Sequence, residues 1–163
     1  MTRTAGVSGI RALAAAAAMA LASTVAGAVE VVEAWSRATP PGATTGVVYL
    51  VVRNPGVAQR SLMRIATPVA TTVSLHASSV DAQGIARMWP VASLRLAPGE
   101  TLRLSPGGRH FMLEGLREPL KAGTRIPLEM QFDGGEAPVR VQVEVRELVP
   151  SAAESGGHGH HAH

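Results

Sequence analysis

Two histidines and two methionines in the middle of the chain carry side chains suited to a soft metal ion. They are His76, Met88, His110 and Met112. Imidazole nitrogen suits copper, and thioether sulfur favours the soft ion Cu(I). Because His110 and Met112 are two residues apart, a strand through Arg109–Leu113 would place both side chains on one face. These residue types therefore predict a copper site with nitrogen and sulfur ligands.

The other histidine of this set lies in a second alternating run, Thr71–Ala77. Val73 and Leu75 alternate there with polar residues, so we expect the apolar pair to face the core. His76 would then lie on the opposite face of the sheet, as His110 does if Phe111 faces the core. The two runs together predict two strands that direct their histidines away from the core.

Met88 follows a predicted hairpin turn at Asp81–Gly84, in a short run of strand character from Ile85 to Trp89. Trp89 comes directly after Met88. It either shields the thioether from water or serves packing alone. The predicted hairpin connects the strand of His76 to the strand of Met88.

The rest of the chain consists of short extended runs separated by turns that are rich in proline and glycine. The predicted strands are Val29–Trp35, Gly46–Arg53, Ser61–Ala66, Glu100–Leu104, Thr124–Phe132 and Val139–Val145. Short strands at a spacing of about 8–12 residues are typical of an antiparallel β-sandwich or barrel. The one helical feature that we expect is a turn near Leu116–Leu120. The sequence therefore predicts an all-β fold in a single domain.

The first 28 residues are typical of a secretory signal peptide. Arg3 and Arg11 supply positive charge, Ala12–Ala22 is apolar, and Ala26–Ala28 is a small-residue cleavage pattern, which predicts cleavage after Ala28. The apolar run is shorter than the ~20 residues that a membrane-spanning helix needs. We therefore expect an exported, periplasmic protein without stable membrane insertion; a retained N-terminal anchor is the alternative.

Composition excludes several classes of function. The chain has no cysteine, which excludes thiolate nucleophiles, disulfide oxidoreductases, iron–sulfur clusters and blue-copper sites with a cysteine ligand. The charges nearly balance, with 15 Lys and Arg against 12 Asp and Glu, and aromatic residues make up 3% of the chain. A nucleic-acid-binding protein would show a basic patch with interleaved aromatics. No carboxylate pair has the spacing for acid–base catalysis and no nucleophile-elbow motif occurs, so we expect no enzyme.

The composition changes again after Pro150. Residues 150–163 are small, polar and histidine-rich, and such a segment should be disordered when free. Its histidines are His158, His160, His161 and His163. They could form a secondary Cu(II) site, because flexible imidazoles bind Cu(II), Ni(II) or Zn(II) with modest selectivity. The alternative is a solvated tail with incidental metal affinity. The predicted organisation is thus a signal peptide over 1–28, a β domain over 29–149 and a tail over 150–163.

The spacing of the four central residues resembles the signature of the PCu(A)C family of periplasmic copper chaperones. Eleven residues separate His76 from Met88, twenty-one separate Met88 from His110, and one separates His110 from Met112. The family hallmark is His, usually Met, ten residues, Met, twenty-one residues and His-x-Met. The sequence departs from it at Ala77, where the family often has a second methionine that is usually not counted among the ligands.

The resemblance extends over roughly Val29–Val149. Further matching segments are Ala34–Ala38, Pro40–Gly42, Tyr49, Asn54, Pro98–Glu100 and Pro106–Leu113. It implies a cupredoxin-like Greek-key β-sandwich or barrel that holds Cu(I) through His76, Met88, His110 and Met112. It also implies copper delivery to respiratory oxidases, with the copper-bearing subunit of cytochrome oxidase and Sco-type copper proteins as partners.

Two questions stay open at this point. A copper-buffering or resistance protein would use the same binding site as a delivery protein, so the sequence does not separate the two. Trp35 and Arg37 either position the first strand or stack on each other as a cation–π pair, and we favour a structural role for both.

Overall fold

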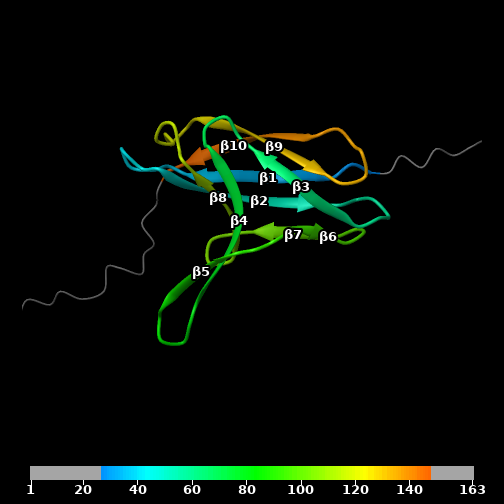
Figure 1. Ribbon diagram of the computed structural model, residues 1–163, viewed down its shortest axis with the longest axis horizontal. Coiled ribbons are helices and arrows are strands. Elements are labelled where there is room, and N and C mark those ends of the chain that lie inside the picture. Colours follow the sequence, from blue (N-terminus) through cyan, green and yellow to red (C-terminus); the bar gives the residue numbers. More distant parts are fainter. Residues whose placement is uncertain (1–26, 148–163) are drawn as a thin grey trace, which may run out of the picture.

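The computed structural model describes residues 27–147, which form one curled β-sheet of ten strands (Figure 1). The strands are β1 (Glu30–Arg37), β2 (Thr45–Arg53), β3 (Arg60–Ala66), β4 (Thr72–Val80), β5 (Ala86–Pro90), β6 (Arg95–Leu96), β7 (Thr101–Leu104), β8 (Arg109–Glu114), β9 (Arg125–Phe132) and β10 (Val139–Arg146). The predicted all-β fold is confirmed. Residues 1–26 of the predicted signal peptide (1–28), and the predicted tail with His158, His160, His161 and His163, lie outside the described residues.

The order of the strands in the sheet is β5-β4-β8-β2-β1-β10-β9-β3-β6, and β7 also pairs with β2. All pairs are antiparallel except β1 and β10, which run parallel. The purely antiparallel arrangement that we expected is therefore wrong at this pair. The expected helical turn at Leu116–Leu120 is also wrong, because this segment is an irregular loop that contains Pro119. No helix among residues 27–147 has the length and apolar character to cross a membrane.

Curling of the sheet encloses the core between its two halves. The segment between β5 and β6 bridges the opening: the Val91 amide donates to the Leu75 carbonyl on β4 over 2.8 Å, and the Leu62 amide on β3 donates to the Leu94 carbonyl over 2.9 Å. The largest core side chains are Leu50, Leu96, Leu104, Phe111, Leu113, Leu128 and Met130. Burial of such apolar surface is the main force that holds the sheet in this shape.

A buried asparagine ties the end of β2 to the segment after β6. The Asn54 side-chain amide donates to the carbonyls of Ala58, Leu96 and Ala97, and its oxygen accepts from the Gly56 amide. A buried amide with all of these partners costs little to bury. Asn54 therefore has a structural role.

The hairpin of β4 and β5 projects away from the rest of the sheet (Figure 1). Its turn lies where predicted: the Gly84 amide donates to the Asp81 carbonyl, and Gly84 has a positive φ of 81°. Glycine adopts this conformation without the steric strain that a Cβ would bring. The hairpin places β5 at one end of the sheet, paired with β4 alone.

Candidate metal centre

The four predicted ligands lie on neighbouring strands at one face of the sheet. His76 on β4 is directly opposite His110 on β8, and Met112 is opposite Ser74. Met88 on β5 is opposite Ser78. The facing residues of β4, which are Ser74, His76 and Ser78, are two apart and therefore point to one face. Directly opposite residues on paired strands share a face, so the four predicted ligands leave the same face of the sheet. Three adjacent strands thus contribute to one site.

This face is the one turned away from the core, as the alternation in the sequence predicted. Leu75 lies between Ser74 and His76 and is buried, and Phe111 and Leu113 are fully buried on the core side. Each of these apolar residues anchors its strand with one face in the core. The histidines and Met112 are therefore held by strands whose register is fixed from the opposite side.

A pocket of about 230 Å³ joins three of the predicted ligands. Met88, His110 and Met112 all line it, together with Arg37 and the start of β2. His76 is not among its lining residues, but the ring centroids of His76 and His110 are 6.2 Å apart. The structure thus brings together all four residues, although they span thirty-seven positions of the sequence from His76 to Met112.

Hydrogen bonding assigns the tautomer of His110. Its Nδ1 lies 3.1 Å from the carbonyl oxygen of Gly108, and a carbonyl accepts only, so Nδ1 carries the proton. Nε2 of the neutral ring then carries the free lone pair. His110 is 5% exposed. A hydrogen bond from the other ring nitrogen to a backbone carbonyl is the usual way in which a protein orients a metal-binding imidazole.

His76 is oriented by a longer relay that ends on a carboxylate. Ser74 Oγ donates to Glu114 Oε2 over 3.1 Å and lies 3.1 Å from His76 Nε2. Because the serine proton goes to the carboxylate, Oγ accepts from Nε2–H of the imidazole. The lone pair of the neutral ring is then on Nδ1.

The Nδ1 atom of His76 is buried and has no hydrogen-bond partner in the structure. A buried polar atom without a partner destabilises a fold by about 1–3 kcal/mol, so such atoms are rare and call for an explanation. A bound metal ion would supply the partner that is missing. The donor set thus fits a metal, with Nδ1 of His76 and Nε2 of His110 as the nitrogens available to it.

A row of aromatic side chains extends from His110 across the same face. The Tyr49 ring centroid lies 6.2 Å from that of His110, and 4.6 Å from that of Trp35. The Arg146 guanidinium carbon lies 5.1 Å above the Trp35 ring. Trp35 therefore stacks with a cation, but the cation is Arg146 on β10 and not Arg37, which was the less favoured alternative of the sequence analysis. Parallel pairing of β1 and β10, which the sequence does not reveal, brings Arg146 there.

Burial raises the pKa of Tyr49 above its ordinary value of 10.0, and the nearby charge of Arg37 lowers it in part. Tyr49 is therefore a neutral phenol at physiological pH. It adds polarity but no charge to the surroundings of His110.

Met88 is the most accessible of the four residues, with 51% of its surface exposed. Trp89 does not shield it. Trp89 pairs with Ala77, whereas Met88 pairs with Ser78, so the two side chains leave opposite faces of β5. One side of the site is therefore open to solvent at the thioether of Met88.

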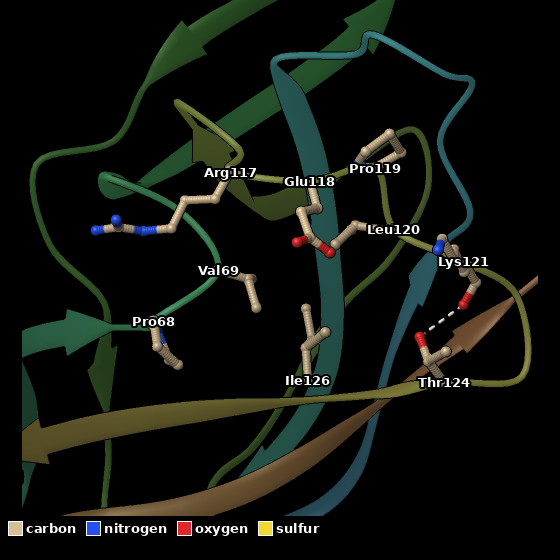
Figure 2. A pocket seen from close by; sticks show the side chains of 9 residues that line it. All are labelled: Pro68, Val69, Arg117, Glu118, Pro119, Leu120, Lys121, Thr124 and Ile126. Atoms are coloured by element: carbon tan, nitrogen blue, oxygen red, sulfur yellow. Dashed lines mark hydrogen bonds between the residues drawn. The ribbon is translucent and has the colours of Figure 1, made fainter.

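Another pocket of the structure lacks both kinds of predicted donor. The pocket in Figure 2, of about 360 Å³, lies between the loop after β8 and the start of β9, and Thr124 donates there to the Lys121 carbonyl. Its lining contains no imidazole or thioether. Within residues 27–147, no three His, Cys, Asp or Glu side chains gather as metal ligands. The mixed nitrogen and sulfur set is the strongest candidate for a metal in this part of the chain.

Sequence reasoning missed three residues of this site: Ser74, Glu114 and Arg37 as part of the pocket. Period-two spacing could have identified two of them, because Ser74 is two residues before His76 and Glu114 two residues after Met112. Side chains at this spacing share a face with the ligand. Arg37 comes from β1, and no local pattern relates it to the site.

Comparison with known proteins gives a family and a fold. Residues 29–145 match the LpqE-like family of lipoproteins. Among curated proteins, no sequence significantly matches this chain.

Several solved structures share the fold. The solution structure of CuI-DR1885 from Deinococcus radiodurans is 30% identical, with a TM-score of 0.59, and the match covers 77% of this chain and 83% of that one. The apo PCuAC domain from PmoF1 is 19% identical with a TM-score of 0.63, covering 76% and 97%. The copper-bound PCuAC domain from PmoF2 is 20% identical with a TM-score of 0.62, covering 76% and 96%.

Proposed function

Because the chain belongs to the PCu(A)C family and shares the cupredoxin-like fold of that family, we propose that it is a periplasmic copper chaperone. The copper-binding residues of the proposal are His76, Met88, His110 and Met112. One observation carries the proposal: His76, whose buried Nδ1 has no partner among residues 27–147, lies directly opposite His110 on the face that also bears the two methionines. The copper-bound states of DR1885 and the PmoF2 domain support the choice of metal.

The chemistry of this donor set suits a carrier of Cu(I). All four donors are neutral, so the bound ion keeps its positive charge and is held less firmly than by thiolates. Thioethers need no deprotonation and cannot form disulfides, which suits the oxidising periplasm. Copper is the cargo here, and the protein orients the donors and limits access of water at His110.

The proposal includes delivery of the ion to the copper-bearing subunit of cytochrome oxidase, alongside Sco-type copper proteins. The second candidate is a copper-buffering or resistance protein that binds Cu(I) at the same residues without specific delivery. The half-exposed Met88 favours delivery, because an acceptor protein can approach this ligand without unfolding the sheet.

Anaerobic Cu(I) titration against a competing chelator, with X-ray absorption at the copper edge, tests the site. We expect one tight equivalent with nitrogen and sulfur scatterers in the mature protein. The double variant Met88→Ala plus Met112→Ala should lose the sulfur shell. Met63→Ala is the matched control, because Met63 is exposed on β3 and lies outside the site. A sulfur shell that persists in the double variant would exclude these methionines as ligands.

The tail histidines form a separate part of the proposal. His158, His160, His161 and His163 would supply a weaker Cu(II) site that captures the oxidised ion. Deletion of residues 151–163 should then lower the Cu(II) stoichiometry and leave Cu(I) binding unchanged. An unchanged Cu(II) stoichiometry would show that the tail has only incidental metal affinity.

A further inference from the structure

The copper pocket contains an arginine that has no ionic partner among residues 27–147. Arg37 lines the pocket with Met88, His110 and Met112. The ion pairs of the described residues involve other arginines, and none includes Arg37. Arg37 is also half-buried. Charged side chains are almost never fully buried without a partner, so a half-buried guanidinium that lacks an anion has lost part of its hydration without compensation.

Arg146, the neighbouring arginine on β10, is paired with carboxylates, whereas Arg37 is not, within the described part of the chain. Arg146 is in register with Arg37 across the parallel pair. It contacts Glu33 at 3.0 Å and Glu144 at 3.2 Å, and it lies over Trp35. The carboxylates on this side of the sheet are therefore engaged with Arg146, and Arg37 is left without one.

The other charged group close to the ligands does not neutralise Arg37 either. Glu114 is on the same face as Met112, but it accepts a hydrogen bond from the hydroxyl of Ser74 and does not line the pocket. The lining of the pocket thus contains one formal charge, that of Arg37. Bound Cu(I) with neutral ligands would add a second positive charge to the same small space. Two like charges this close together favour a nearby anion.

We propose that Arg37 makes the copper pocket an anion subsite, which binds a carboxylate next to the copper ligands. This inference rests on the proposed copper function and deepens it. Arginine presents a planar fork of N–H donors that matches a carboxylate, and such charge-assisted pairs are the strong ones. The volume of about 230 Å³ is below the usual range for a drug-sized ligand, so the pocket suits a metal ion with one small group.

The carboxylate has two sources, a free organic anion or an acidic side chain of the copper-accepting protein. In both cases the anion offsets the charge of Arg37 and approaches the ion from the side of Met112 and Met88. A side chain that enters this pocket would bring the acceptor to the ligand that is most exposed. Arg37 would in that case couple recognition of the acceptor to release of the ion.

The test uses the mature full chain and three variants: Arg37→Gln, Arg37→Lys and the control Arg95→Gln. Arg95 is exposed on β6, at the other end of the sheet from β5. The first measurement is anaerobic Cu(I) titration without added carboxylate, in which the unaltered protein and the control Arg95→Gln should bind one equivalent. Failure of the unaltered protein to bind copper here would overturn the proposed function itself.

The second measurement is an acetate titration of the Cu(I)-loaded proteins at constant ionic strength, followed by NMR at the Arg37 side-chain N–H and neighbouring amides. We expect saturable shifts in the unaltered protein and in Arg95→Gln, weaker binding in Arg37→Lys, and loss of about tenfold or more in Arg37→Gln. Copper binding without a saturable acetate response, or an equal response in Arg37→Gln, would overturn the anion subsite and leave the copper site intact.

The third measurement distinguishes the sources of the carboxylate. Transfer of Cu(I) to an apo copper domain of cytochrome oxidase is timed with and without acetate. If the carboxylate comes from the acceptor, acetate competes, and both acetate and Arg37→Gln slow the transfer. If it comes from a free anion, acetate leaves transfer as fast or faster. Transfer that depends on neither acetate nor Arg37 would overturn a role for the subsite in release.

Discussion

Each imidazole of the site has one nitrogen engaged and the other free, and the engaged partners differ. His110 is held by a backbone carbonyl, so no substitution of a side chain removes its partner. His76 is held by Ser74, which is held in turn by Glu114. The orientation of His76 is therefore open to a test by mutation.

Ser74→Ala should weaken Cu(I) binding by roughly tenfold or more, because loss of the serine hydroxyl leaves the ring of His76 free to rotate and to change its tautomer. Chelator competition measures the affinity, and ¹⁵N NMR of the imidazole should show a mixture of tautomers for His76. Ser79→Ala on the same strand is the control, since Ser79 is exposed and makes no contact with the relay. An affinity equal to that of the control would show that Ser74 does not position the ligand.

Tyr49 gives a prediction about pH, because it is the one tyrosine of the chain and its ultraviolet phenolate signal is unambiguous. Burial raises its pKa above 10.0, and Arg37 opposes the rise. The copper-free protein should therefore ionise Tyr49 above pH 10, and Arg37→Gln should raise this pKa further. A lower pKa in the variant would contradict the proximity of the two groups.

The same shift has a consequence for stability. The folded protein holds the phenol proton at pH values where the unfolded chain has lost it. The contribution of Tyr49 is therefore fully present below pH 10, and the free energy of unfolding falls as the pH rises above this value. Denaturant titrations on either side of pH 10 measure the difference.

At the scale of an element, residues of β8 that stabilise the core alternate with residues of the proposed metal site. Phe111 is fully buried in the core, whereas Met112 faces the site and is partly exposed. Phe111→Ala should lower the free energy of unfolding by about 3–5 kcal/mol through the cavity it leaves. Met112→Ala should lower it by about 1 kcal/mol or less and impair Cu(I) binding.

Urea unfolding of the copper-free proteins checks this pair of values. Met112 would have to belong to the core, contrary to the register of β4 and β8, if its removal were as damaging as that of Phe111.

Local pattern explains why so much of these elements could be predicted. Residue composition, turn residues and alternation identified nine strands to within a few residues, and alternation assigned Leu75 and His76, and Phe111 and His110, to opposite faces. The two-residue strand β6 was not predicted, because Arg95–Leu96 is too short to show a period. The contacts of Trp35 and the position of Arg37 in the pocket were not predicted either. Both depend on which strands meet across the sheet, and this is decided by the whole core.

At the scale of the whole molecule, delivery and buffering predict different rates of transfer. A delivery protein should metallate an apo copper domain of cytochrome oxidase faster than a small Cu(I) complex of equal affinity does. The reason is that docking positions the ligands of donor and acceptor together. Stopped-flow measurement under anaerobic conditions gives both rates. Equal rates would favour the buffering function.

The position of β5 at the end of the sheet has a consequence for the lifetime of the complex. Three of the donors come from β4 and β8, which are paired on both sides, whereas Met88 comes from a strand that is paired on one side and exposed throughout. The proposed site would therefore combine three donors on strands paired at both edges with one donor, Met88, that can leave more easily. Exchange of the ion should proceed by an associative route, in which an incoming ligand replaces Met88 first. Within the proposed coordination sphere, thermodynamic retention and kinetic lability would thus be separated, and the residence time of copper would depend on the hairpin of β4 and β5.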